Sequence, residues 1–206
     1  AESFSALFNV VSMMGVGCGS PHPWGAFGPV MITSVADYLC VGGHDAVAHE
    51  VTEDLALAAE YRRAGLPLTI RLGRGAVRYR MYPNGFRSLV EGWTKNMATG
   101  ANHTPWPRLV AVAAWVSALA SLSLEVVVAL TATSPPGWPP LALAALAAAQ
   151  LALFCRVAGR FGWWVPVAFP VQVVVFVAVF LRSVWRTTVS GTVTWKGRTL
   201  DARPGP

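Results

Sequence analysis

The chain has 206 residues, of which 54% are hydrophobic and 13% are charged, and its 16 basic and 10 acidic side chains give a formal net charge of +6. In an ordinary globular domain roughly a quarter of the residues are charged, so this composition argues against a single soluble globule, and its apolar content excludes an intrinsically disordered chain. Three cysteines without a CxxC pair indicate neither a disulfide scaffold nor a zinc site. Because the chain begins without an initiator methionine, we expect it to start partway through a longer protein.

The charge-rich first half has the pattern of a mixed α/β unit. Residues 27–32 form a short apolar run that is typical of a buried strand. Residues 66–72 and 76–82 are β-type runs, and the glycine-containing residues 73–75 join them.

Three helices are also predicted in this half. The first lies around residues 36–39 and stops at Gly42 and Gly43. The second has Thr52 as its N-cap, acidic residues in its first turn and arginines in its last turn, and it stops at Gly65. The third covers residues 85–97, whose apolar side chains fall on one face, and we expect it to lie along a membrane surface.

Three apolar runs follow in the second half. Residues 109–131 contain one ionisable group, Glu125, and are long enough to cross a hydrocarbon layer of about 30 Å. Residues 141–158 are interrupted by two polar side chains, and residues 163–181 contain two prolines, so both are interpreted as spans or near-spans. A basic tail completes the chain.

The basic residues around these runs predict a topology. The loop between the first two runs is uncharged, whereas Arg156 and Arg160 lie between the second and third, which places these arginines in the cytosol. Three full crossings would then leave the basic tail outside. Either one run lies in the interface or re-enters without crossing, or the third run forms a tight hairpin. We expect a cytosolic tail.

Glu53 and Asp54 at a helix start have two interpretations. In the first, each carboxylate is stabilised by about 0.3–1 kcal/mol near the free N–H groups of a helix N-terminus, and this stabilisation alone explains the two acids. The same position on the rim of a sheet keeps an aspartate ionised and able to accept a proton from a hydroxyl. The nearby residues 49–53 resemble a zinc HExxH motif, but Glu53 replaces the second histidine, so no metalloprotease is predicted.

Several motifs follow one another in a specific order: residues 42–47, 53–57, Gly65, residues 92–96, the apolar spans and residues 195–198. This order resembles the C-terminal half of membrane-bound family-two glycosyltransferases. The lipid and carotenoid-type enzymes, including the diaponeurosporenoate and ceramide glucosyltransferase groups, are the most similar.

The resemblance implies an α/β fold, in which residues 1–106 are the acceptor-side, C-terminal part of a GT-A (Rossmann-like) catalytic domain. Residues 107–184 would be transmembrane helices and residues 185–206 a basic cytosolic tail. It also implies sugar transfer, with inversion, from a nucleotide-sugar donor to a membrane lipid or isoprenoid acceptor. The protein would be a multi-pass protein of the cell membrane with its catalytic part in the cytosol.

By the same resemblance Asp54 would be the catalytic base. The substrate-binding residues would be Gly42, Gly43, Glu53, Trp93, Lys95, Lys196 and Arg198. Residues 91–96 depart from the family's Gln/Arg-x-x-Arg-Trp element, which favours single-sugar transfer over processive synthesis.

The resemblance further implies Mg²⁺ or Mn²⁺ as cofactor, yet the family's Asp-x-Asp motif is absent from this chain, so no metal ligand is assigned. We therefore expect the donor-binding half to be missing. The alternative is a non-catalytic integral membrane protein, a transporter fragment or an anchoring subunit, with Glu125 and Gln150 as intramembrane polar groups. Nucleic acid is not an expected partner, because the basic residues of the second half lie at span ends rather than on one solvated face.

Overall fold

The computed structural model describes residues 2–73, 76–77, 79–131, 137–195 and 198–201, and of residues 193–195 and 198–201 it describes the backbone. Its helices are α1 (Ala6–Val16), α2 (Val35–Cys40), α3 (Glu53–Arg63), α4 (Phe86–Asn102), α5 (Trp106–Thr131), α6 (Trp138–Ala158) and α7 (Phe169–Trp185). Short 3₁₀ helices cover η1 (Glu2–Ser5) and η2 (Gly43–Val47), and a wide π-helical turn, η3 (Arg186–Ser190), continues α7. Strands β1 (Thr192–Trp195) and β2 (Arg198–Asp201) form an antiparallel hairpin in which Thr192 pairs with Asp201.

The expected α/β, Rossmann-like fold is wrong for the described residues, which are mainly helical and contain the β1–β2 hairpin as their one sheet. Residues 27–32, predicted as a buried strand, run as irregular chain, and the side chain of Ile32 is 94% exposed. The described parts of residues 66–72 and 76–82 are also irregular. A strand must pair its N–H and C=O groups with a neighbouring strand, and apolar composition alone supplies no such neighbour.

The predicted helices of the first half are confirmed as α2, α3 and α4. Helix α3 starts directly after Thr52, and Gly65, which follows its C-cap, has a φ of +71° that suits glycine. Helix α4 buries Leu89, Trp93 and Met97 on one face, in agreement with its apolar spacing.

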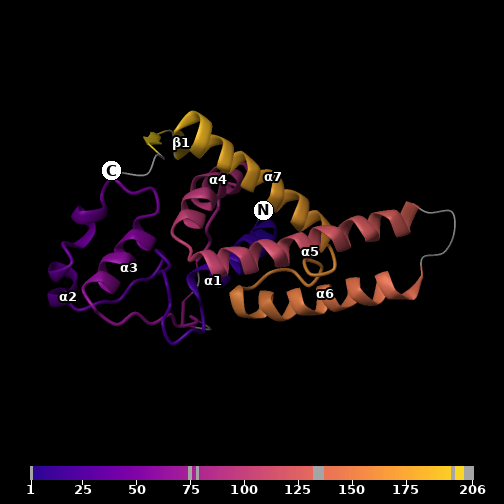
Figure 1. Cartoon of the computed structure of the whole chain (residues 1–206), viewed down its shortest axis with the longest axis horizontal. Coiled ribbons are helices and arrows are strands. Elements are labelled where there is room, and N and C mark those ends of the chain that lie inside the picture. The colour runs from indigo at the N-terminus through magenta and orange to yellow at the C-terminus, as the bar shows by residue number, and fades with distance from the viewer. Residues whose placement is uncertain (1, 74–75, 78, 132–136, 196–197, 202–206) are drawn as a thin grey trace.

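Helices α5, α6 and the run from α7 through η3 are each long and apolar enough to cross a membrane. Helices α5 and α6 form a long antiparallel pair, and α7 runs back beside α5 towards α4 (Figure 1). Pro170 is accommodated in the first turn of α7, where no intrahelical N–H is needed, so α7 is continuous and is not a tight hairpin. Because β1 and η3 contact α4, the end of α7 lies beside the helix that leads into α5.

Helix α1 lies in the centre of this bundle and contacts α4, α5, α6 and α7. Leu7 and Phe8 are completely buried. The ring of Phe8 stacks on Trp93, with 5.0 Å between the ring centroids, and also lies 5.0 Å from Phe176 of α7. Helix α1 thus joins α4 to the membrane helices, which its short apolar sequence did not predict.

A buried serine fastens α7 to α4. The Ser183 hydroxyl donates to the Thr94 carbonyl at 2.5 Å and accepts from the Ala98 amide at 2.9 Å. These are the two backbone groups that a regular α-helix pairs with each other. Ser183 is fully buried, so this bond fixes α4 to α7 close to Lys95.

Replacing Phe8 with alanine should test the central position of α1. The variant loses the ring contacts with Trp93 and Phe176, and we expect the free energy of unfolding to fall by about 3–5 kcal/mol. Denaturant unfolding of the purified protein in detergent micelles measures the change. Leu39→Ala, at an exposed position of α2, is the control and should change it by less than about 0.5 kcal/mol; equal effects would contradict a core role for α1.

Candidate functional site

The site is built around Asp54, in the first turn of α3. One carboxylate oxygen, Oδ2, accepts the Gly28 amide at 2.9 Å, and the other, Oδ1, accepts the Leu55 amide at 2.9 Å. A Cβ added at Gly28 would lie 3.3 Å from Oδ2, a tighter approach than most side chains make. Gly28 therefore allows the irregular segment before α2 to hold the carboxylate in one orientation.

The pKa of Asp54 is raised above its usual range. Burial is the main cause, because it disfavours the charged form, and the neighbouring charge of Glu53 adds to it. The N–H groups of Gly28 and Leu55 oppose the rise. A carboxylate with a raised pKa is a stronger proton acceptor than an exposed aspartate, which suits a general base.

A cavity of about 550 Å³ lies beside Asp54. Its polar side chains include Thr52, Tyr79 and Asn96. The apolar part of its wall comes from the membrane helices: α5 supplies Leu109, Val112, Ala113 and Val116, and α7 supplies Phe176, Val177 and Phe180. One continuous cavity therefore connects the carboxylate at the start of α3 with the apolar interior of the bundle.

The structure brings four of the predicted site residues to this cavity: Glu53, Asp54, Trp93 and Lys95. Trp93 is buried against Phe8, and its indole N–H donates to the Ser5 hydroxyl at 3.3 Å, so the ring has a fixed position. Lys95 is half-buried on the same helix, α4. The roles of these side chains towards a substrate stay predictions.

Gly42 and Gly43 form the predicted turn, with φ of +76° and +57°, but they are not among the residues that line the cavity. A Cβ at Gly43 would lie 2.6 Å from the Tyr38 ring, whose hydroxyl bonds to Nδ1 of His44 at 2.7 Å. The packing of Tyr38 therefore explains the glycine at position 43, and substrate binding by the pair stays a prediction.

Of the two tail cations predicted to bind substrate, Lys196 and Arg198, the structure describes the backbone of Arg198. Lys196 lies outside the described residues. Arg198 is in β2, opposite Trp195 of β1, and β1 contacts α4. The hairpin backbone is thus beside the helix that carries Trp93 and Lys95.

The residues present do not fit a divalent cation. Among the side chains that the structure describes, His, Cys, Asp and Glu form no group of three that could hold a metal. The Mg²⁺ or Mn²⁺ implied by the resemblance therefore has no ligand set among the described side chains, and no chemical step is assigned to it.

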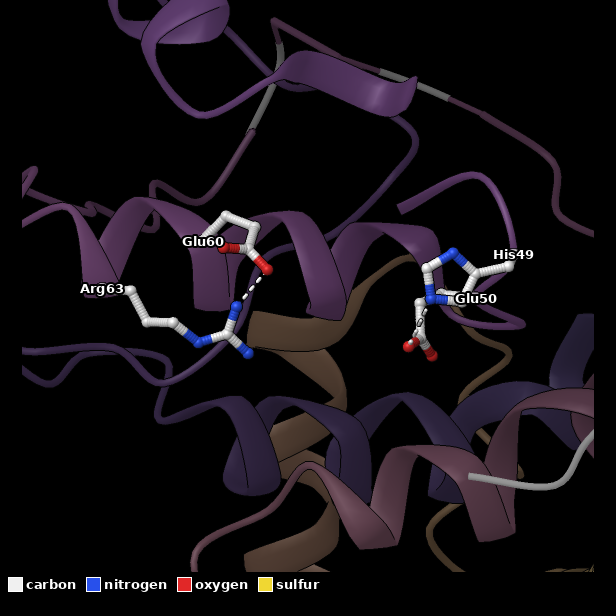
Figure 2. A network of polar contacts seen from close by, with 4 residues as sticks. All are labelled: His49, Glu50, Glu60 and Arg63. Atoms are coloured by element: carbon white, nitrogen blue, oxygen red, sulfur yellow. Dashed lines mark hydrogen bonds and ion pairs between the residues drawn. The ribbon is translucent and has the colours of Figure 1, made fainter. Parts of the chain in front are cut away.

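Four other charged or titratable side chains near α3 form two pairs (Figure 2). Glu60 pairs with Arg63 in the last turn, and Glu50 lies 3.6 Å from Nε2 of His49. His49, the first residue of the near-HExxH pattern, is exposed and has a neighbouring carboxylate as its partner.

Two features of the site were missed by sequence reasoning. Gly28 is 26 residues from Asp54, and no local pattern links the two. The hydroxyl of Thr52, predicted as a helix cap, makes no cap bond; it is buried, with no hydrogen-bond partner in the described structure, and Thr52 lines the cavity. The Gly28–Asp54 contact and the burial of Thr52 both depend on how separate segments pack.

Comparison with known proteins defines the class. A model described as glycosyl transferase family 21 matches residues 24–206, so the chain belongs to glycosyl transferase family 21. Proteins named 4,4'-diaponeurosporenoate glycosyltransferase, from Staphylococcus aureus strains USA300 and MRSA252, are 33% identical to it over 202 residues, covering 96% of this chain and 54% of theirs. The resemblance seen in the motifs is confirmed. The chain spans about half the length of these curated relatives, and no solved structure matches it.

The raised pKa of Asp54 predicts a pH-dependent stability. Since the folded state favours the protonated carboxyl, the stabilising contribution of Asp54 is fully present below its unfolded pKa and is lost as pH rises through the folded value. The melting temperature of the wild type relative to Asp54→Asn should therefore fall from about pH 4 towards neutral pH. Thermal unfolding in detergent at several pH values measures this difference.

The exposed carboxyl of Asp45 provides the control, since Asp45→Asn removes an acid outside the cavity. A constant difference between the wild type and Asp54→Asn across this pH range would show that Asp54 is not perturbed by burial.

Proposed function

We propose that this chain is the acceptor-binding and membrane part of a glycosyltransferase that moves a sugar, with inversion, from a nucleotide-sugar donor to a membrane lipid or isoprenoid acceptor. The observation that carries the proposal is the single cavity with Asp54 at its polar part and the apolar walls of α5 and α7 beyond it. An amphiphilic acceptor fits such a cavity with its reactive group at the carboxylate. Membership of family 21 and the name of the relatives support a glycosyltransferase with a carotenoid-like acceptor.

In the proposed reaction the acceptor hydroxyl oxygen attacks the anomeric carbon of the donor sugar. A new carbon–oxygen bond forms, the hydroxyl proton passes to Asp54, and the bond from the sugar to the leaving diphosphate breaks with its electron pair. The Gly28 amide fixes the carboxylate so that it need not reorient when the proton arrives. Attack opposite to the leaving group inverts the anomeric configuration.

The other predicted residues have supporting roles in this proposal. Trp93 would contact the acceptor through the part of its ring that faces the cavity, and Glu53 and Lys95 would bind the polar groups of the substrates. Lys95 with Lys196 and Arg198 would offset negative charge on the leaving diphosphate. The hairpin backbone beside α4 supports the part given to Arg198.

We also propose a multi-pass protein of the cell membrane with the cavity's polar part on the cytosolic side. Arg156 is in the last turn of α6 and Arg160 follows that helix, and basic residues are enriched at the cytosolic ends of membrane spans. The end of α7 contacts α4, so a basic tail on the cytosolic side is compatible with a site on that side. In this arrangement the irregular segment between α6 and α7 enters the membrane, and the continuous helix α7 brings the chain back to the cytosolic side. Val165 in that segment and Phe169 at the start of α7 are buried, as non-helical backbone at membrane depth requires.

The alternative of a non-catalytic membrane protein has less support. The carbonyl of Gln150 accepts the Trp115 indole N–H at 2.8 Å, so this intramembrane polar group joins α6 to α5. Glu125 is exposed on α5 and lies outside the cavity lining. Neither residue forms a polar pathway through the described bundle.

Replacing Asp54 with asparagine in the full-length protein should abolish sugar transfer. The amide keeps the shape of the side chain but cannot take the proton, and loss of a general base lowers turnover by about 10²–10⁴-fold. Donor-dependent labelling of membrane lipids with radioactive sugar measures the transfer. Glu60→Gln, in the last turn of the same helix and outside the cavity lining, is the matched control and should retain most activity. Retained turnover in a folded, membrane-inserted Asp54→Asn protein would remove Asp54 from the base role.

A further inference from the structure

We propose that the acceptor enters the cavity sideways from the bilayer along α5, and that Ala113 sets the width of the chain that can enter. This inference rests on the proposed function and adds the route and the shape of the acceptor. The occupant is a single linear apolar chain with its reactive hydroxyl at one end.

The α5 wall of the cavity reaches the surface of the molecule. Its lining side chains are on one face of the helix, at the spacing i, i+3, i+4, i+7 and i+8, and they are Leu109, Val112, Ala113, Val116 and Ser117. Leu109 is 38% exposed, and Ala113 and Ser117 are also exposed, although all three line the cavity. Because α5 is apolar and long enough to span a membrane, this open wall would face lipid chains rather than water.

The opposite wall is aromatic and fixed. Phe176 of α7 is buried, with its ring 5.0 Å from Phe8 and stacked on Phe180 at 6.1 Å. Close-packed aromatic rings in a protein interior move little when a ligand binds. The free width at this level therefore depends on the α5 side, where Ala113 has the smallest apolar side chain of the wall.

The depth of the wall limits how much of the acceptor it can hold. From Leu109 to Ser117 the helix rises about 12 Å, less than half of a hydrocarbon layer of about 30 Å. The chain beyond this depth must continue in the bilayer, which requires a wall open to lipid. The lining from α5 and α7 carries no charge, so it suits a neutral hydrocarbon chain and excludes a charged headgroup.

Ala113→Leu and Ala114→Leu form a matched pair that tests this route. Both alanines are exposed on α5, but only Ala113 lines the cavity. The full-length protein in membrane vesicles is given its nucleotide-sugar donor and either a methyl-branched polyprenol or an unbranched long-chain alcohol. Ala113→Leu should raise the KM for the branched alcohol about tenfold, which corresponds to about 1.4 kcal/mol of binding, and change that for the unbranched alcohol much less. Ala114→Leu should change neither.

Ala113→Gly provides a test in the opposite direction, because it widens the entrance and should lower the KM for the branched acceptor. If either Ala113 variant left the ratio of the two KM values at that of the wild type, or if Ala114→Leu shifted it equally, lateral entry at Ala113 would be wrong. Wild-type protein that transfers sugar to neither alcohol would instead contradict the acceptor class in the proposed function. Sugar transfer that persists in Asp54→Asn would contradict the role of Asp54 as base. The entry route would still be tested by the ratio of the two KM values.

Discussion

The site depends on one interaction, the hydrogen bond from the Gly28 amide to the Asp54 carboxylate. Partial burial of a carboxylate costs free energy, and the amides of Gly28 and Leu55 offset part of it while fixing the direction of both oxygens. Burial still exceeds this compensation, because the pKa remains raised. An apolar or amide side chain at position 54 would avoid the cost of the charge, so the aspartate agrees with the proposed role as base better than with a role in stability.

Helix α4 transmits this arrangement to the membrane part of the chain. Its residues Trp93 and Lys95 line the cavity. Phe8 of α1 stacks on Trp93, and Ser183 of α7 hydrogen-bonds to the α4 backbone. Each contact joins segments that are 85 or more residues apart. The proposed reactive group and the proposed lipid-binding wall are thus parts of one packed unit.

Family membership and the structure support different parts of the proposed function. Membership of family 21 gives the class, sugar transfer, but the chain covers about half of the relatives' length, and the donor site has no geometry in the described residues. The structure supports the proposed acceptor side with a carboxylate, a cavity and apolar walls that belong to membrane helices. The proposal is therefore more specific for the acceptor than for the donor.

The sequence by itself determined the helices after α1 and the class of protein. Capping and charge signals located α3 between Thr52 and Gly65, and long apolar runs located α5 and α6, because these signals are local in the chain. The order of several motifs along the chain led to the correct family. The strand at residues 27–32 was predicted wrongly, since apolar composition cannot distinguish a paired strand from an irregular segment. The Gly28–Asp54 bond, the central place of α1 and the cavity between α5 and α7 were decided by the tertiary structure alone. Each is a contact between segments far apart in the chain, and no periodicity or spacing encodes such a contact.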